Sequence, residues 1–93
     1  MTVEQIRALG FDWPGSDSME QYAVESGGGV DLDATLNALR RGLEVYQGQL
    51  NEMQGYERRW NADVSDQQGD AATKAAEMRR AIGVVEAIRT KAR

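Results

Sequence analysis

The sequence predicts an all-α fold. The expected architecture is a long antiparallel helical hairpin, about residues 31–64 and 70–92, with two short N-terminal helices folded against it. A spacing of alternately four and three residues places one apolar stripe on the first long helix: Leu32, Leu36, Leu39, Leu43, Tyr46, Leu50, Met53, Trp60 and Val64. A second apolar face follows near the C-terminus: Ala71, Ala75, Met78, Ile82, Val85, Ile88 and Ala92. Turn and capping residues between them predict a loop within 64–70, and a short connection favours antiparallel neighbours.

The N-terminal third predicts two short helices. Thr2 and Gln5 fit a capping box at the start of the first, and Gly10 fits its end. Asp17 with Glu20 is expected to cap the second.

An aromatic turn separates these helices. Pro14 presets its own φ, and Gly15 supplies the positive φ that a type II turn requires. Phe11 and Trp13 flank the turn, and we interpret them as plugs that close the end of a core. The run Gly27–Gly29 predicts a flexible hinge between segment 1–26 and the hairpin 30–93, within one domain of 93 residues.

The long helix fits a coiled-coil heptad pattern, but the e and g positions that flank its apolar seam carry almost no charges that could pair between two helices. Asp31 and Asp33 fit its N-cap and first turn. Since charge pairs at the flanks would set the register of a free-standing dimer, their absence indicates a seam packed within the chain. Glu57 interrupts the stripe, and we expect it to fix the register or to face water. Gly48 and Gly55 lie opposite the leucines, where they either admit another backbone or are tolerated weak points.

Helix lengths raise the question of what covers the first half of the stripe. At 1.5 Å per residue the first long helix spans about 50 Å and the second about 33 Å. The first two heptads therefore need another cover, either the N-terminal helices or a second chain. We predict the protein-interaction surface there and at the two outer glycines: Leu32, Leu36, Leu39, Leu43, Tyr46, Gly48 and Gly55.

Charge is unevenly distributed along the chain. The net charge is −4, yet residues 1–33 carry seven acids against one arginine, a net charge of −6. The C-terminal stretch is basic, and the favoured explanation is either attraction between the two ends within the fold or cations in the final turns that complement the helix dipole. Four of the acids form a candidate surface for a basic partner: Asp12, Asp17, Glu20 and Glu25.

The composition argues against several function classes. The absence of cysteine and histidine excludes disulfides, thiolate metal sites and histidine acid–base chemistry, and no other catalytic constellation stands out. We expect neither an enzyme nor a protein with a metal, a cofactor or a small-molecule substrate. Nucleic-acid binding is disfavoured by the acidic balance, and no apolar run is long enough to insert into a membrane. The N-terminus lacks a classical signal peptide, so we expect a cytoplasmic location or export by another route.

Two partial resemblances bear on function. A helical hairpin of about a hundred residues with a tryptophan near the bend resembles the family of small secreted hairpins that carry a Trp-x-Gly motif there. In this chain the bend contains Trp60-Asn61-Ala62, which lacks the glycine of that motif. "VYQGQLNEMQGYERRW" is similar to a stretch of secretion-needle subunits, although the proline turn expected before it is missing. The sequence therefore predicts a non-enzymatic protein–protein interaction module, such as an assembly subunit or adaptor of a secretion or phage system, which could form a homodimer. The alternative is a small acidic inhibitor, for example phage-encoded, that occupies a basic site on a host protein.

Overall fold

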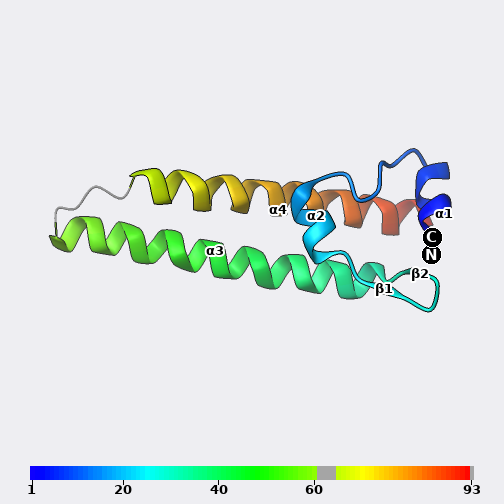
Figure 1. Ribbon diagram of the computed structural model, residues 1–93, viewed down its shortest axis with the longest axis horizontal. Helices are drawn as coiled ribbons and strands as arrows, with labels where there is room; N and C mark the ends of the chain where they lie inside the picture. Colours follow the sequence, from blue (N-terminus) through cyan, green and yellow to red (C-terminus); the bar gives the residue numbers. More distant parts are fainter. Residues whose placement is uncertain (61–64, 93) are drawn as a thin grey trace.

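A computed structural model describes residues 1–60 and 65–92 of the chain. Two long antiparallel helices, α3 (Leu32–Trp60) and α4 (Ser65–Ala92), make up an elongated body that measures 51 × 20 × 19 Å. The N-terminal segment packs over one end of this hairpin (Figure 1), and both chain termini lie at that end. The expected all-α hairpin with short N-terminal helices is confirmed.

The start of α3 follows the local chemistry of its sequence. Asp31 Oδ1 accepts a hydrogen bond from the Ala34 amide at 2.9 Å, and Asp33 lies in the first turn. A carboxylate at this position satisfies an amide that has no partner inside the helix, and its charge complements the helix dipole. The interpretation of these acids as helix-capping residues is confirmed.

The second long helix begins earlier than the sequence indicates. α4 starts at Ser65, so Gly69 and Asp70 lie inside it, and the loop expected within 64–70 is wrong for residues 65–70. Serine is typical of helix starts, and an interior glycine costs about 1 kcal/mol relative to alanine. Burial of Ala71 and Ala75 in the next two turns offsets that cost. Residues 61–64, which include Val64, lie outside the described part of the chain.

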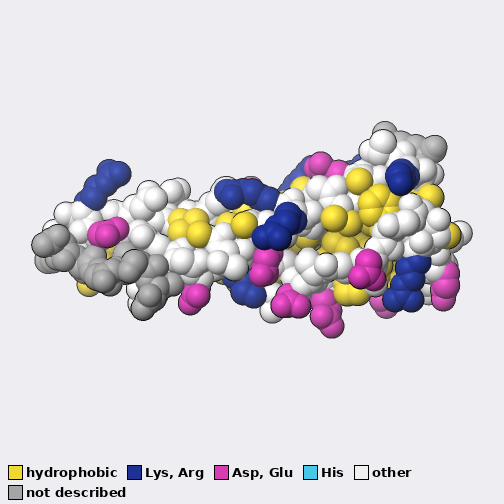
Figure 2. All heavy atoms as spheres, turned by 90° about the horizontal axis from the view of Figure 1, so that it is seen from above, with side chains coloured by type: hydrophobic (Ala, Val, Ile, Leu, Met, Phe, Trp, Pro, Cys, Tyr) yellow, Lys and Arg dark blue, Asp and Glu magenta, His cyan; other side chains and the backbone are white. Residues whose placement is uncertain are grey.

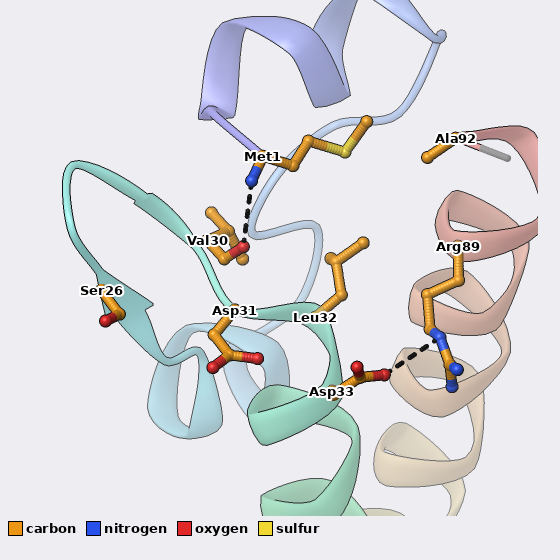
Figure 3. Close-up of a pocket in the computed structure, with 8 residues that line it drawn as sticks. All are labelled: Met1, Ser26, Val30, Asp31, Leu32, Asp33, Arg89 and Ala92. Carbon is orange, nitrogen blue, oxygen red and sulfur yellow. Dashed lines mark hydrogen bonds and ion pairs between the residues drawn. The ribbon is translucent and has the colours of Figure 1, made fainter.

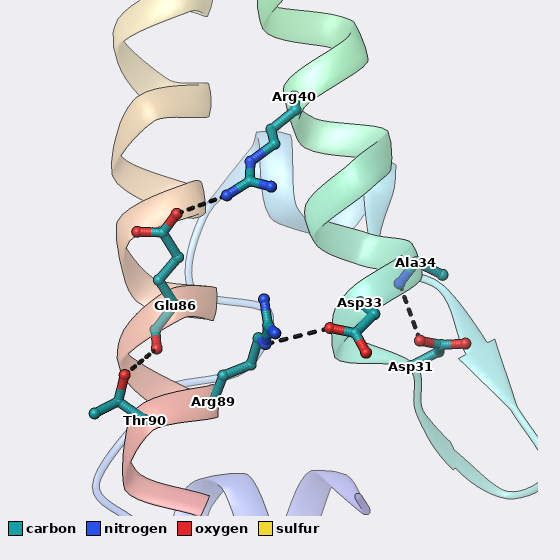
Figure 4. A network of polar contacts seen from close by, with 7 residues as sticks. All are labelled: Asp31, Asp33, Ala34, Arg40, Glu86, Arg89 and Thr90. Carbon is teal, nitrogen blue, oxygen red and sulfur yellow. Dashed lines mark hydrogen bonds and ion pairs between the residues drawn. The ribbon is translucent and has the colours of Figure 1, made fainter.

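The earlier start changes the register of the hairpin. With 29 and 28 residues, the helices span about 44 and 42 Å. The expectation that residues 32–46 extend beyond the second helix is therefore wrong. Two ion pairs mark where α4 lies beside them, Arg89 Nε to Asp33 Oδ1 at 3.2 Å and Arg40 Nη2 to Glu86 Oε1 at 3.1 Å (Figure 4).

The hydrophobic core is concentrated at the end of the hairpin that carries the N-terminal segment. We call this end, residues 1–42 with 77–92, the head. Helix α2 (Asp17–Tyr22) packs on both long helices and crosses them in Figure 1. The core draws one or more residues from almost every segment of the head: Ile6, Trp13, Met19, Val30, Leu36, Leu39, Ala81, Val85 and Ile88.

The N-terminal helices form largely as expected. Helix α1 (Val3–Ala8) has the Thr2–Gln5 capping box, and Gly10 follows it with φ of 95°. For α2 the cap is Ser16, whose Oγ accepts from the Met19 amide at 3.1 Å, so the assignment of Asp17 as cap is one residue late. Ser16 is the N-cap because it is the extended residue before the helix, and its short side chain reaches the amide at N3.

The aromatic turn closes the core, as the sequence predicts. Trp13 is 4% exposed, and Phe11 packs against the same cluster. Gly15 has φ of 77°, and the Trp13–Pro14 peptide bond is cis. Lys91 of α4 lies over the Phe11 ring at 5.1 Å from its centroid, so the C-terminal helix also contacts this turn.

The glycine run forms a small β-hairpin that the sequence pattern does not predict. Strands β1 (Glu25–Ser26) and β2 (Gly29–Val30) pair antiparallel through a loop of Gly27 and Gly28. Both loop glycines have positive φ, 62° and 82°, as the tightest hairpin turns require. The Val30 amide donates to the Met1 carbonyl, which extends this pairing to the start of the chain.

Candidate interaction surface

The leucine half of the stripe lies mostly inside the head. Leu36 and Leu39 are 2% and 0% exposed, and Leu32 and Leu43 are half-buried. Their own chain supplies the cover, because α4, α2 and the N-terminal segment contribute to the same cluster. Leu32, Leu36 and Leu39 therefore stabilise the fold of a single copy, whereas Leu43 does not belong to this cluster.

Beyond α2 the molecule narrows to two helices. We call this part, residues 43–59 of α3 and 67–76 of α4, the stalk. Ala71 and Ala75 of α4 are buried there, whereas Tyr46, Leu50 and Met53 of α3 are only half-buried. Small residues on α4 let the two helices approach closely, but no third element shields the edges of their seam in the described chain (Figure 1).

Two large apolar side chains project from the stalk. Val45 is 59% exposed and Tyr56 is 53% exposed. They lie eleven residues apart, which is close to three helical turns, so they share one side of α3. Isolated exposed hydrophobic residues are common on proteins, but these two border the half-buried residues of the seam. Gln49 and Glu52, which are also exposed, lie between them on that side of α3.

A hollow lies on this side of α3, next to the end of α2. It has a volume of about 390 Å³, and its lining is Tyr22, Ala38, Arg41, Gly42, Val45, Tyr46 and Gln49. Most of the exposed lining atoms are apolar. The hollow is open to solvent and could receive a side chain of another protein.

Gly42 explains how α2 comes to lie so close to α3. A Cβ at this position would be 2.7 Å from Met78 Cε and 3.1 Å from Tyr22 Cζ. Of the two alternatives for Gly48 and Gly55, the close approach of another segment is found at Gly42 instead. A Cβ added at Gly48 or Gly55 would have no described atom within 4 Å, so both positions remain accessible on the outer side of α3.

The four candidate acids of the N-terminal segment all lie on the surface. Asp12, Asp17, Glu20 and Glu25 are exposed, and none forms an ion pair with another described residue. Glu20 and Glu25 line one shallow hollow together with Arg7. In the view of Figure 2, hydrophobic side chains gather over the head, and charges of both signs are spread along the molecule.

Another hollow of the head is polar and lies near Met1 and Ala92. It has a volume of about 520 Å³ and includes Met1, Asp31, Asp33 and Arg89 in its lining (Figure 3). Asp33 and Arg89 pair with each other there, and Asp31 caps α3. These charged groups already have structural partners, so the hollow presents no convergent set of free catalytic groups.

Ser18 is the buried polar residue of α2, and its role is structural. It is 2% exposed, and its hydroxyl donates to Glu77 Oε2 at 3.1 Å, which ties α2 to α4. Glu57, the acid that interrupts the stripe, is exposed and accepts from Gln68 Nε2 at 3.2 Å. Of the alternatives predicted for Glu57, exposure to water is the one observed, and its hydrogen bond to Gln68 links it to α4.

Two properties of the described residues bear on function. No group of three or more histidine, cysteine, aspartate or glutamate side chains is placed to hold a metal ion within residues 1–60 and 65–92. Among the helices of that same part, none combines the length and the apolar character needed to span a bilayer. Comparison with protein-family models, curated proteins and solved structures gives no match for this chain.

Proposed function

We propose that this chain is a non-enzymatic protein–protein interaction module of the assembly-subunit or adaptor kind. One observation carries the proposal: the head buries its own core, whereas one side of the stalk and the 390 Å³ hollow between the head and the stalk remain open. Val45 and Tyr56 on that side are more than half exposed. Exposed apolar side chains that border a hollow are typical of sites that another protein covers.

Affinity capture from the source cells tests this proposal. We expect the tagged chain to retain one or more proteins, or further copies of itself, and a V45E/Y56E double variant to lose them. Ala72→Glu is the matched control, because Ala72 is an exposed residue of α4 in the same part of the stalk. Equal retention by the double variant and the control would contradict the role of the stalk.

A second candidate function rests on the exposed acids of the N-terminal segment. A small inhibitor could present Asp12, Asp17, Glu20 and Glu25 to a basic site on another protein, since all four are free of ion pairs with the described residues. Such binding would weaken as salt screens the charges. If neutralising the four acids to amides leaves partner binding and its salt dependence unchanged, the inhibitor hypothesis is lost.

A further inference from the structure

We propose that residues 1–11, which include α1, form a lid over one end of the head, and that Lys91 of α4 is the clamp that holds this lid closed. Loss of the positive charge on Lys91 then opens the lid while the rest of the head stays folded. The inference concerns the head alone, so it does not depend on which protein contacts the stalk.

The helix of the lid buries little of its own surface. Ile6 is the one fully buried residue of α1, and four of the other residues of this helix are exposed: Glu4, Gln5, Arg7 and Ala8. A helix of six residues is too short to be stable without contacts to the rest of the protein. Segments with few buried contacts are also the ones that open locally before the whole protein unfolds. The position of α1 therefore depends on the contacts that fasten the lid.

Lys91 contacts the lid on both sides of Gly10. Its Nζ donates to the Leu9 carbonyl oxygen at 3.3 Å, and the same atom lies 5.1 Å from the centroid of the Phe11 ring. Gly10 itself has φ of 95°, and no described atom lies within 4 Å of a Cβ added there. One cation thus fixes the residues before and after the turn that sets the direction of α1.

The positive charge of Lys91 is the property that this contact uses. A carbonyl oxygen and the face of an aromatic ring both carry negative potential, so both attract an ammonium group, and neither attracts a neutral side chain of the same length in this way. In the described ranges 1–60 and 65–92, Lys91 forms no ion pair. Within those ranges the lid is therefore the partner of this charge.

The other end of the lid is fastened to β2 and borders the polar hollow. The Val30 amide donates to the Met1 carbonyl oxygen, and the Met1 amine donates to the Val30 carbonyl oxygen at 3.4 Å (Figure 3). Met1 and Val30 both line the hollow of about 520 Å³, and Val30 is 4% exposed. When the lid opens, Met1 moves away and Val30 is uncovered. The lid therefore controls access to the apolar core from this hollow.

Amide hydrogen exchange of the full chain, measured for each residue by NMR, tests the clamp. The amides of Leu9 and Phe11 report the lid, because each donates to a carbonyl oxygen of α1. The amides of Ala23 and Val24 report the rest of the head, where they donate to α2 and α3. Lys91→Met removes the charge and keeps the length of the side chain. We expect this variant to exchange about two- to fivefold faster in the lid and at an unchanged rate at Ala23 and Val24.

Three further variants serve as controls. Lys91→Arg keeps the charge, and a guanidinium also donates hydrogen bonds and lies over aromatic rings, so exchange in the lid should stay close to that of the unaltered chain. Lys74→Met changes the other lysine of the chain, whose side chain is 43% exposed on α4, and should leave the lid unchanged. Phe11→Leu removes the ring, so Lys91→Met should have a smaller effect in that background.

Three results would overturn the proposal. Exchange in the lid of Lys91→Met at the rate of the unaltered chain would show that the charge does not hold the lid closed. Equal acceleration at Ala23 and Val24 would show that Lys91 stabilises the whole head and that the lid does not open separately. The same acceleration in Lys91→Arg as in Lys91→Met would show that the contact does not depend on charge.

Discussion

The contrast between Gly42 and Gly48 gives a sharp test of how the N-terminal segment packs on the hairpin. Both glycines lie inside α3, where replacement by alanine contributes about 1 kcal/mol through helix propensity alone. At Gly48 no described atom lies within 4 Å of the added Cβ. We therefore expect Gly48→Ala to raise the free energy of unfolding by about 1 kcal/mol.

At Gly42 the same gain meets a steric cost. The added Cβ would be 2.7 Å from Met78 Cε and 3.0 Å from Met78 Sδ, well inside the optimal carbon–carbon separation of about 3.5–4.0 Å. Met78 is 1% exposed, so its side chain has little free space to move into. Overpacking of this kind costs about 1–3 kcal/mol. Gly42→Ala should therefore be less stable than Gly48→Ala by about that amount.

Urea denaturation followed by circular dichroism at about 1 µM chain measures both variants with little contribution from self-association. In a thermal scan, each 1 kcal/mol should appear as about 4–8 °C in Tm. The double variant Gly42→Ala/Met78→Leu removes the clashing methyl and should recover part of the loss, a coupling that neighbouring residues show. Equal stabilisation by alanine at both glycines would refute the close packing of α2, α3 and α4 around Gly42.

Two further variants test the head. Leu39→Ala changes a fully buried site and should lower the free energy of unfolding by about 2–5 kcal/mol. Leu50→Ala changes a half-buried site in the stalk and should lower it by clearly less. Equal effects in urea titrations would argue against a core concentrated in the head. Thr35→Val should cost about 1–3 kcal/mol, because the Val24 amide loses the hydroxyl that accepts from it at 2.9 Å. Thr90→Val is the control, because Thr90 is exposed on α4, and it should change the free energy of unfolding by less than about 0.5 kcal/mol. Similar values for both threonine variants would show that the buried hydrogen bond of Thr35 contributes little.

The helices could be predicted because their signals are local and repeated. The four-three spacing of the apolar stripe, the Thr2 capping box and the acids at the start of α3 each act within a few residues of the chain. The burial of Trp13 could be predicted for a similar reason, because a large aromatic side chain next to a tight turn commonly packs against the core.

The start of α4 was not predictable in the same way. Ser65, Asp66, Gly69 and Asp70 all favour turns and helix ends, so local propensity places the loop too late. Tertiary packing against α3 overrides that propensity and carries the helix through Gly69. The predicted start of α4 is about five residues too late, so the predicted second helix is too short to lie beside the start of α3. For this reason the leucine half of the stripe appeared to need another cover.

The site was only partly predictable. Tyr46 was expected at the interaction surface and lines the hollow, but Val45, Gln49 and Tyr56 were missed because they lie off the seam. A signal for the α2 contact was present in the sequence. Thr35, Ala38 and Gly42 place small residues along one edge of α3, where another element can approach closely. Which edge an additional element uses depends on contacts distant in sequence, and the heptad pattern alone does not contain that information.

Hydrogen–deuterium exchange at low and high chain concentration distinguishes a head that closes on itself from one that a second copy must close. If the head is self-contained and the stalk is the interaction surface, residues 32–42 and 78–90 should be strongly protected at every concentration. Amides of residues 43–59 should exchange faster than these at every concentration, because no third element of the described chain covers the stalk. Weak protection of residues 32–42 at low concentration, rising as the chain is concentrated, would show instead that another copy covers the leucines, and would contradict the division into head and stalk.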